Sequence, residues 1–324
     1  MSLQVSVVIP TKNEEQNIVN CIRSLQEVEG RESISQIIVV DNGSTDSTVS
    51  KAKALGAEVL MLESGTISQL RNLGADFSTG EVIAFIDADV CVKKEWLNNA
   101  LICFEETKAV CVGSSPAIPE KNTWVERAWH YQIVIRPHRY EKDWLASMNM
   151  LVLKGAFDKV NGFNPNLYTC EDVDFGYRIN KLGKIVFDKS ITAVHFGEAK
   201  SIVQLFRKES WRGISNFDGI LQHGIVLNEV RSHAVALLYL LLYPIIALTT
   251  LLAMYEVTVP LVLLSLLVPL VKTFHLIRPP VKPLLLFQIY LTWLVYCWAR
   301  GFSGLLLFKR WLLQRSPIEN SRIR

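Results

Sequence analysis

Two aspartates interrupt an apolar run in the segment VIAFIDADVCV, residues 82–92. The run predicts a buried strand, and Asp87 and Asp89 stand at its end, one residue apart. Burying an unpaired carboxylate is costly, and two ionised carboxylates side by side repel each other. The pair therefore faces water, cations or a bound ligand, and we expect a positive group there.

A second carboxylate pair, Glu171 and Asp172, lies in the segment TCEDVDFGYR. A carboxylate in a site can take a proton from a reacting hydroxyl. Asp174 would point the same way as Asp172 only if this segment were extended. If the segment begins a helix, the three acids also suit its positive N-terminal end, with Phe175 and Ile179 facing inward. The residues alone leave both alternatives open.

The elements around these acids predict an α/β fold. Short β-branched runs alternate with segments in which apolar residues recur at helical spacing. Continuous apolar strands between helices indicate a mainly parallel, Rossmann-like sheet that is covered on both faces. The expected strands are residues 5–9, 36–40, 58–62 and 81–86, and the expected helices lie within 18–28, 45–55 and 68–77.

Such sheets bind ligands beyond the carboxyl ends of their strands. Neither GxGxxG nor a P-loop motif occurs, so a dehydrogenase or a P-loop enzyme would lack its phosphate-binding loop. A divalent metal on carboxylates can hold a diphosphate instead, because hard oxygen ligands suit Mg²⁺ or Mn²⁺. We expect Asp89 to ligate this metal, and Asp87 to face the nucleoside or share the cation. Polar clusters follow three expected strands and converge on this edge: Pro10-Thr11-Lys12-Asn13-Glu14, Asp41-Asn42-Gly43-Ser44 and Asp87-Ala88-Asp89.

Four segments in this order resemble the family 2 glycosyltransferases, which have the GT-A fold. The resemblance spans about residues 5–215. It implies a nucleotide-diphosphate sugar as donor and a DxD metal motif at Asp87-Ala88-Asp89. The segments are VSVVIPTKNEEQNI, VVDNGSTDST, RNLGADFSTGEVIAFIDADV and GFNPNLYTCEDVDFGYRINKLG.

The resemblance also implies roles for single residues around the donor. Pro10, Glu14 and Asp41 would contact the base and ribose, with Thr11 and Asn13 beside them in the substrate site.

Further implied roles concern the nucleotide, the base and the metal. Arg71 would touch the nucleotide, and Asp172 would act as the base of an inverting transfer, with Glu171 beside it. His195 would complete the metal site with Asp89, although a lone histidine after a strand is more often a structural residue.

Two positions depart from the family pattern. Gln204 and Arg207 resemble the QxxRW motif of processive synthases, but Lys208 replaces the tryptophan, which weakens a polymerase interpretation. Arg207, Lys208 and Arg212 are expected to contact the diphosphate or an anionic acceptor, with solvated helix charges as the alternative. Gln204 is expected in the substrate site together with Arg207. Lys12 stands where many relatives have an aromatic residue, so the base stays open, with a UDP-sugar as the first candidate.

The C-terminal part predicts a membrane region. Half of the 324 residues are hydrophobic, and the mean hydropathy is +0.23. Residues 234–255 carry no charge and are long enough to cross a bilayer, and 257–277 is the expected second span. Residues 283–308 include Arg300 and could cross once, lie in the interface or re-enter.

Basic residues set the expected orientation. Lys272, Arg278 and Lys282 follow the second apolar segment, and a basic tail at 309–324 follows the third. Both groups favour the cytoplasmic side, so two spans plus an interfacial or re-entrant segment satisfy them. The expected organisation is a catalytic domain at 1–200, an amphipathic interfacial helix and linker at 201–230, a membrane region at 231–308 and a cytoplasmic tail at 309–324.

Other features narrow the class of protein. The net charge is only +3, so no general nucleic-acid surface is indicated. The six cysteines form no CxxC pair and are expected to be reduced, and the N-terminus does not resemble a cleaved signal peptide. Aromatic and basic residues between Trp124 and Trp144 either surround an acceptor entrance at the membrane or belong to an ordinary core.

The sequence therefore predicts a multi-pass cell-membrane protein with a cytoplasmic catalytic domain. It would transfer a sugar to a lipid-linked or nascent-glycan acceptor at the bilayer. A processive polysaccharide synthase is the nearest alternative. A non-enzymatic transporter or scaffold would leave the three polar clusters on one sheet edge unexplained.

Overall fold

The computed structural model describes residues 3–167, 169–214, 227–277 and 281–312. It contains two compact units. The first comprises Met1–Asn122 and Gln132–Glu198, and the second comprises Thr123–Tyr131 and Ala199–Arg324. Part of the expected linker, Arg278 and most of the expected basic tail lie outside the described residues.

An eight-stranded mixed sheet forms the centre of the first unit. Its strands are β1 (Val5–Thr11), β2 (Ile34–Asp41), β3 (Glu58–Met61), β4 (Val82–Ile86), β6 (Cys111–Gly113), β7 (Arg139–Lys142), β8 (Asn149–Leu153) and β9 (Ile185–Asp188). Their order is β3-β2-β1-β4-β8-β6-β9-β7. The first four strands are parallel, whereas β8 is antiparallel to both β4 and β6. The four predicted strands and the mainly parallel arrangement are confirmed.

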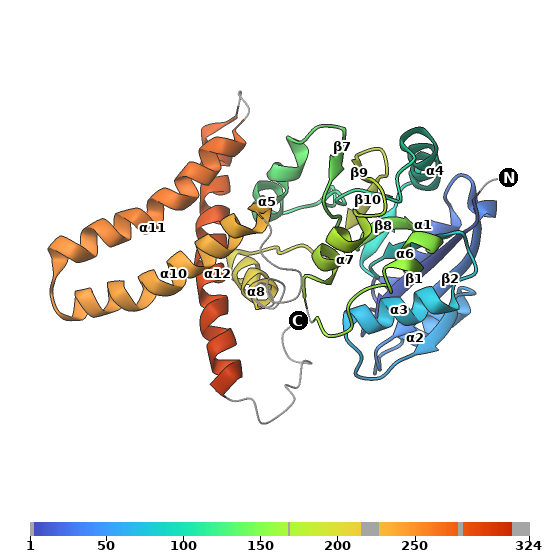
Figure 1. The fold of residues 1–324 in the computed structure, drawn as a ribbon, viewed down its shortest axis with the longest axis horizontal. Helices are drawn as coiled ribbons and strands as arrows, with labels where there is room; N and C mark the ends of the chain where they lie inside the picture. Colours follow the sequence, from blue (N-terminus) through green and yellow to red (C-terminus); the bar gives the residue numbers. More distant parts are fainter. Residues whose placement is uncertain (1–2, 168, 215–226, 278–280, 313–324) are drawn as a thin grey trace. The chain divides into compact units, whose positions relative to one another are not determined.

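Helices cover both faces of this sheet (Figure 1). Because β-strand side chains alternate between faces, Val7 and Ile9 of β1 enter one hydrophobic cluster and Val8 enters the other. This explains why the sequence of β1 is apolar throughout rather than alternating. One face carries α1 (Ile18–Gln26), α2 (Thr48–Ala54) and α4 (Trp96–Thr107), and the other carries α3 (Ile67–Phe77), α6 (Lys154–Lys159) and α7 (Glu171–Ile179).

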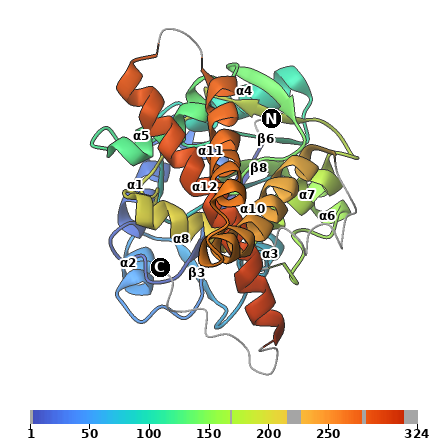
Figure 2. The ribbon, with the colours of Figure 1, turned by 90° about the vertical axis from the view of Figure 1, so that its left-hand side faces the viewer.

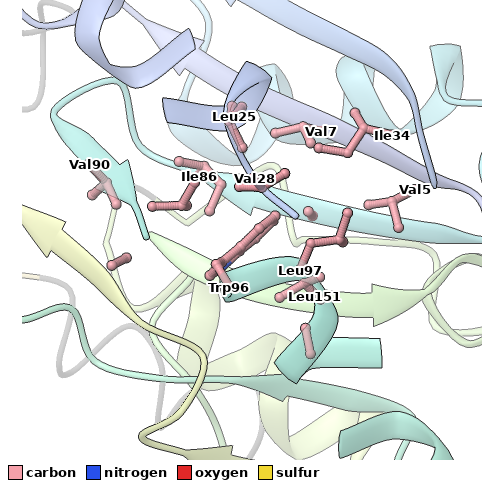
Figure 3. Packing of buried hydrophobic residues seen from close by; sticks show 14 of the residues in the cluster. Val5, Val7, Leu25, Val28, Ile34, Ile86, Val90, Trp96, Leu97 and Leu151 are labelled. Carbon is pink, nitrogen blue, oxygen red and sulfur yellow. The ribbon is translucent and has the colours of Figure 1, made fainter. Parts of the chain in front are cut away.

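Trp96 is the largest fully buried side chain of the first cluster. Figure 3 shows it among residues of β1, α1 and β8. Its indole Nε1 donates a hydrogen bond to Asn149 Oδ1 at 2.8 Å. The paired indole nitrogen lets a polar ring lie in an apolar core without a desolvation penalty.

A two-stranded sheet adjoins the end of β4. It pairs β5 (Val90–Val92) with β10 (Ala193–His195) in antiparallel register, so that His195 lies opposite Val90. This pairing brings a residue from the end of the first unit next to the Asp87-Ala88-Asp89 segment.

Helices form the described part of the second unit: α8 (Ile202–Gly213), α10 (Leu227–Leu251), α11 (Tyr255–Leu276), α12 (Pro283–Leu312) and the first part of α5 (Trp124–Val134). In Figure 1, α10 and α11 form a hairpin to one side of α12, and in Figure 2 this hairpin points toward the viewer.

Two of these helices are long and apolar enough to cross a membrane. They cover His233–Leu251 and Tyr255–Leu276, which correspond to the two expected spans. The third apolar segment forms one continuous helix, α12, and not the broken segment that a re-entrant form requires. An interfacial or a spanning α12 remains compatible with this geometry.

Aromatic and basic side chains stabilise the second unit. Trp129 packs against Trp293 and Tyr296 with ring centroids 5.5 and 5.8 Å apart, and the Lys272 ammonium lies 4.9 Å from the Trp293 ring centroid. Trp129 is therefore a packing residue of this unit, as the ordinary-core alternative for the aromatic stretch predicts.

A charged residue lies on the buried side of α8. Glu209 is 1% exposed, whereas Trp211 of the same helix is 46% exposed. Glu209 accepts hydrogen bonds from Arg212 at 2.7 Å and from Arg300 at 2.8 Å. Two cationic partners offset the cost of burying this carboxylate, so a charged residue occupies a position that periodicity alone assigns to an apolar one.

Candidate active site

Parallel strands β1, β2 and β4 end at one edge of the sheet, and the three polar clusters follow these ends. Thr11 lies opposite Asp41 in the register of β1 and β2. Asp41 is fully buried and accepts two hydrogen bonds from Ser44, one from its backbone N–H at 2.8 Å and one from its hydroxyl at 2.5 Å. These bonds hold the loop after β2 in a fixed turn.

The loops after β1 and β2 are joined by side-chain hydrogen bonds. Asn13 has a left-handed backbone, φ 55°, which asparagine tolerates better than most residues. Its N–H donates to the Ser44 hydroxyl at 2.8 Å, and its Oδ1 accepts from the Thr45 N–H at 2.8 Å. The Glu14 N–H donates to the Thr48 hydroxyl at 2.8 Å. Pro10 lies buried at the end of β1. The first two clusters thus form one continuous surface at the sheet edge.

Asp87, Ala88 and Asp89 directly follow β4. Ala88 is buried, whereas the side chains of Asp87 and Asp89 are 29% and 23% exposed. The two carboxylates are held by different partners, because Asp87 pairs with Arg71 and Asp89 pairs with His195. Both aspartates stay partly accessible at the edge where a ligand of such a sheet binds.

Arg71 of α3 joins the end of β4 to the start of α7. Its Nη2 donates to Asp87 Oδ1 at 2.8 Å, and its Nη1 donates to Glu171 Oε1 at 2.7 Å. Its side chain is 3% exposed and lies over the Phe163 ring. Burial alone would lower the pKa of Arg71, but the Asp87 and Glu171 carboxylates more than offset this effect and raise it. The guanidinium remains charged and fixes both acids.

His195 lies against Asp89 because of the β5–β10 register. Its Nε2 is 3.2 Å from Asp89 Oδ2, and its Nδ1 is 3.0 Å from Glu198 Oε1. Burial would lower the pKa of His195, but the hydrogen bonds to Asp89 and Glu198 raise it to about 9. Glu198 was not anticipated from the sequence, and the only signal is its position three residues after His195.

Gly197 makes this contact possible. A Cβ atom at this position would lie 1.9 Å from Asp89 Oδ2 and 2.8 Å from His195 Nε2. Any side chain at position 197 would therefore displace one of these two groups.

The segment of the second carboxylate pair is helical, which excludes the extended alternative for Asp174. In α7, Phe175 and Ile179 are buried, as the helical alternative predicts. Glu171 pairs with Arg71, while Asp174 accepts from Arg178 Nη2 at 2.6 Å. These two acids are thus paired and buried rather than solvated.

Asp172 is partly exposed at the start of α7. Its Oδ1 accepts from the Val173 N–H at 2.9 Å. Of the three acids in this turn, Asp172 is the most exposed.

A divalent cation fits the Asp89 and His195 pair by its chemistry. Carboxylate and imidazole groups suit Mn²⁺, and carboxylate oxygens suit Mg²⁺. Within the part of the chain that the structure describes, no three His, Cys, Asp or Glu side chains form a complete metal cage.

Gln204 and Arg207 belong to α8 of the second unit. Gln204 Oε1 accepts from the Lys200 N–H at 2.8 Å, next to the Ser201 cap of α8, and Arg207 is exposed. The alternative of solvated helix charges suits Arg207, whereas Gln204 helps to cap the helix.

Comparison with known proteins identifies the family of this domain. The model of "Glycosyl transferase family 2" matches residues 6–163. Glycosyltransferase AglE of Haloferax volcanii is 26% identical over 215 residues, which cover 63% of this chain and 70% of AglE. The poly(ribitol-phosphate) beta-N-acetylglucosaminyltransferase TarS of Staphylococcus aureus is 31% identical over 110 residues, which are 32% of this chain and only 19% of TarS.

One solved structure resembles nearly the whole chain. Mannosyltransferase PcManGT from Pyrobaculum calidifontis, in complex with GDP-Man and Mn²⁺, aligns with a TM-score of 0.64 and 16% identity over 98% of this chain and 89% of PcManGT. At this identity the likeness concerns the fold. The family match therefore identifies a family 2 glycosyltransferase domain over residues 6–163. The likeness to PcManGT shows that this chain has the GT-A type of fold.

Proposed function

We propose that this protein is a membrane-associated, metal-dependent glycosyltransferase that transfers a sugar with inversion from a nucleotide-diphosphate sugar to a membrane-associated acceptor. The observation that carries the proposal is the pairing of Asp89 with His195 at the strand-end edge, 3.2 Å apart. This edge is where a sheet of this type binds its ligand.

The donor would bind across the loops after β1, β2 and β4. The joined loops around Asn13 and Ser44 offer a surface for the base and ribose, next to Pro10, Thr11, Glu14 and Asp41. The complex of PcManGT with GDP-Man supports a nucleotide-diphosphate sugar as donor class. The base stays open between uracil and guanine, because Lys12 gives no stacking surface that would select it.

Asp89 and His195 would hold Mg²⁺ or Mn²⁺, with Asp87 beside them. A bound divalent cation offsets the negative charge that develops on a departing diphosphate. Gly197 lets the Asp89 carboxylate pack directly against the backbone. Glu198 would fix the orientation of the His195 ring, as a carboxylate partner does for metal-binding histidines. Arg71 keeps Asp87 turned toward α3.

Asp172 would take the proton of a hydroxyl acceptor. Arg71 and Arg178 already engage the neighbouring acids Glu171 and Asp174, so these acids position the start of α7. Because these ion pairs hold the start of α7 in place, Asp172 would stay aligned with the donor, which lowers the entropic cost of the reaction.

The second unit supports membrane association. Apolar side chains of its two candidate spans are exposed, among them Leu251 at 83% and Leu263 at 60%. Exposed apolar surface of this extent in a helical hairpin suits contact with lipid. We propose that both helices cross the cell membrane and that the catalytic domain lies in the cytoplasm.

Calorimetry tests the proposal. The full-length protein in detergent is titrated with UDP, GDP and ADP, each with and without Mn²⁺. We expect one nucleoside diphosphate to bind, and its affinity to fall when Mn²⁺ is removed or when Asp89 is replaced by Asn. A transporter or scaffold predicts no metal-dependent nucleotide binding, and that result would overturn the proposal.

A further inference from the structure

Lys142, the last residue of β7, places its charge on an aromatic surface. Its Nζ lies 4.6 Å from the centroid of the Trp144 ring and 6.0 Å from that of Phe187. Within the described part of the chain, Nζ makes no hydrogen bond and no ion pair within 4 Å. A cation held in this way retains its capacity to bind an anion.

Trp144 in turn contacts α7, the helix that begins with the second carboxylate pair, Glu171 and Asp172. A Cβ atom on Gly176 would lie 2.2 Å from the Trp144 Cβ and 2.7 Å from its Cα, so only glycine allows this close approach. Gly176 lies four residues after Asp172, and residues at this spacing share one face of a helix. Trp144 and Lys142 are thereby placed along the face of α7 that carries Asp172.

The charges around Lys142 agree with this placement. Burial and the nearby Arg136 lower the pKa of Lys142 to about 8, whereas Asp172 and Asp143 raise it. Asp172 is thus one of the two carboxylates whose charge acts on the Lys142 ammonium. A poorly solvated ammonium beside the proposed base stabilises an anion more than an exposed lysine does.

We propose that Lys142 and Trp144 form an acceptor subsite that binds a phosphate group of the acceptor next to Asp172. The inference rests on the proposed function and names the acceptor class of that site. The ammonium supplies a charge-assisted contact to the phosphate, and the Trp144 ring limits where the ammonium can lie. A hydroxyl-only acceptor would gain nothing from a cation at this point.

Binding of small phosphates tests the subsite. The full chain in detergent, with Mn²⁺ and the nucleoside diphosphate it prefers, is titrated with farnesyl phosphate, farnesol and inorganic phosphate. We expect farnesyl phosphate to bind at least about tenfold more tightly than farnesol, as a hydrogen bond to a charged group predicts. Tighter binding of farnesyl phosphate than of inorganic phosphate identifies a lipid source, and equal affinities identify the phosphate group alone.

Variants assign the effect to Lys142. Lys142→Gln is expected to weaken farnesyl phosphate binding by about tenfold, and Lys142→Arg to retain most of it. Lys184→Gln removes the same charge from an exposed lysine that pairs with Glu141, and it should leave the affinity unchanged.

Nucleotide binding separates the two levels of inference. If Lys142→Gln binds the nucleoside diphosphate and Mn²⁺ normally but also binds farnesyl phosphate as tightly as the unmodified chain, the subsite is overturned and the proposed function stands. The subsite is also overturned, and the proposed function stands, if neither farnesyl phosphate nor inorganic phosphate binds the unmodified chain. Loss of metal-dependent nucleotide binding in the unmodified chain overturns the proposed function itself.

Discussion

Arg71 donates a hydrogen bond to Asp87 at 2.8 Å and, with its other terminal nitrogen, to Glu171 at 2.7 Å. A single buried guanidinium thus joins the first acid after β4 to the first residue of α7. Because both acids belong to motifs with proposed roles in transfer, Arg71 ties the donor side of the candidate site to the side that carries Asp172. We infer that it acts as a positioning residue between the two acidic motifs.

Arg71→Ala should destabilise the first unit. Removing one partner of a buried ion pair leaves uncompensated charge, which costs about 3–5 kcal/mol. We expect the midpoint of thermal unfolding, followed by circular dichroism, to fall by several degrees. Lys51→Ala removes a cation from an exposed pair with Glu15, where surface pairs contribute about 0–1 kcal/mol, and serves as the control. Equal midpoints for both variants would contradict a structural role of the Arg71 pairs.

Glu198→Gln should weaken the metal site without removing a proposed ligand. The carboxylate faces His195 Nδ1 at 3.0 Å, and loss of such a partner typically lowers metal affinity by about 10–100-fold. The measurement is calorimetric titration of Mn²⁺ in the presence of the nucleoside diphosphate. Glu105→Gln, an exposed acid on α4, makes the same chemical change and should not alter the affinity. Unchanged Mn²⁺ binding in Glu198→Gln would show that His195 has a structural role.

Gly197→Ala should abolish metal-dependent nucleotide binding. The added Cβ would lie 1.9 Å from Asp89 Oδ2, so the carboxylate must move away from its present place. Metal-independent affinity for the nucleotide should persist, because the loops after β1 and β2 are untouched. Gly155→Ala is the matched control, since no atom lies within 4 Å of a Cβ added there. Nucleotide binding by Gly197→Ala with the same Mn²⁺ dependence as the unmodified chain would contradict the prediction.

The sequence predicts the sheet better than it predicts the contacts that join its loops. The strands ending at Thr11, Asp41 and Ile86 follow from apolar runs, because their side chains are buried on both faces of the sheet. Arg71 and Glu171 lie 100 residues apart, and no local pattern indicates that they meet. The family resemblance implies a nucleotide contact for Arg71, and the structure adds its pairing with Asp87 and Glu171.

Other contacts could not be predicted either, because they depend on segments that lie far apart in the sequence. Glu198 and Lys142 look like ordinary surface charges in the sequence, and only the β5–β10 pairing and the packing of Trp144 on Gly176 reveal their neighbours. Periodicity also assigns an apolar residue to the position of Glu209. Its partner Arg300 lies 91 residues further along the chain, beyond the range of any helical pattern.

Asp172→Asn distinguishes two kinds of acceptor. General-base catalysis contributes about 10²–10⁴-fold, so transfer to a hydroxyl acceptor should fall by at least about 10²-fold, with donor binding intact. A phosphate oxygen is already ionised and needs no base, so transfer to a phosphate acceptor should depend less on Asp172. Turnover with each acceptor and calorimetric donor binding are measured for the same preparation. A full loss of donor binding in Asp172→Asn would instead place Asp172 in donor recognition.

The affinity for farnesyl phosphate should fall as the pH rises through about 8. Lys142 has a pKa of about 8, so it is charged below this pH and loses its proton above it. The second pKa of a phosphate monoester is about 6, so its charge is nearly constant between about pH 7 and 10. The other charged groups that act on the ammonium are Arg136, Asp143 and Asp172. Titrations from pH 7 to 9.5 should therefore show a steady loss of affinity for farnesyl phosphate. The Lys142→Arg variant stays protonated and should not show this loss. If its affinity falls in parallel, Lys142 is not the titrating group.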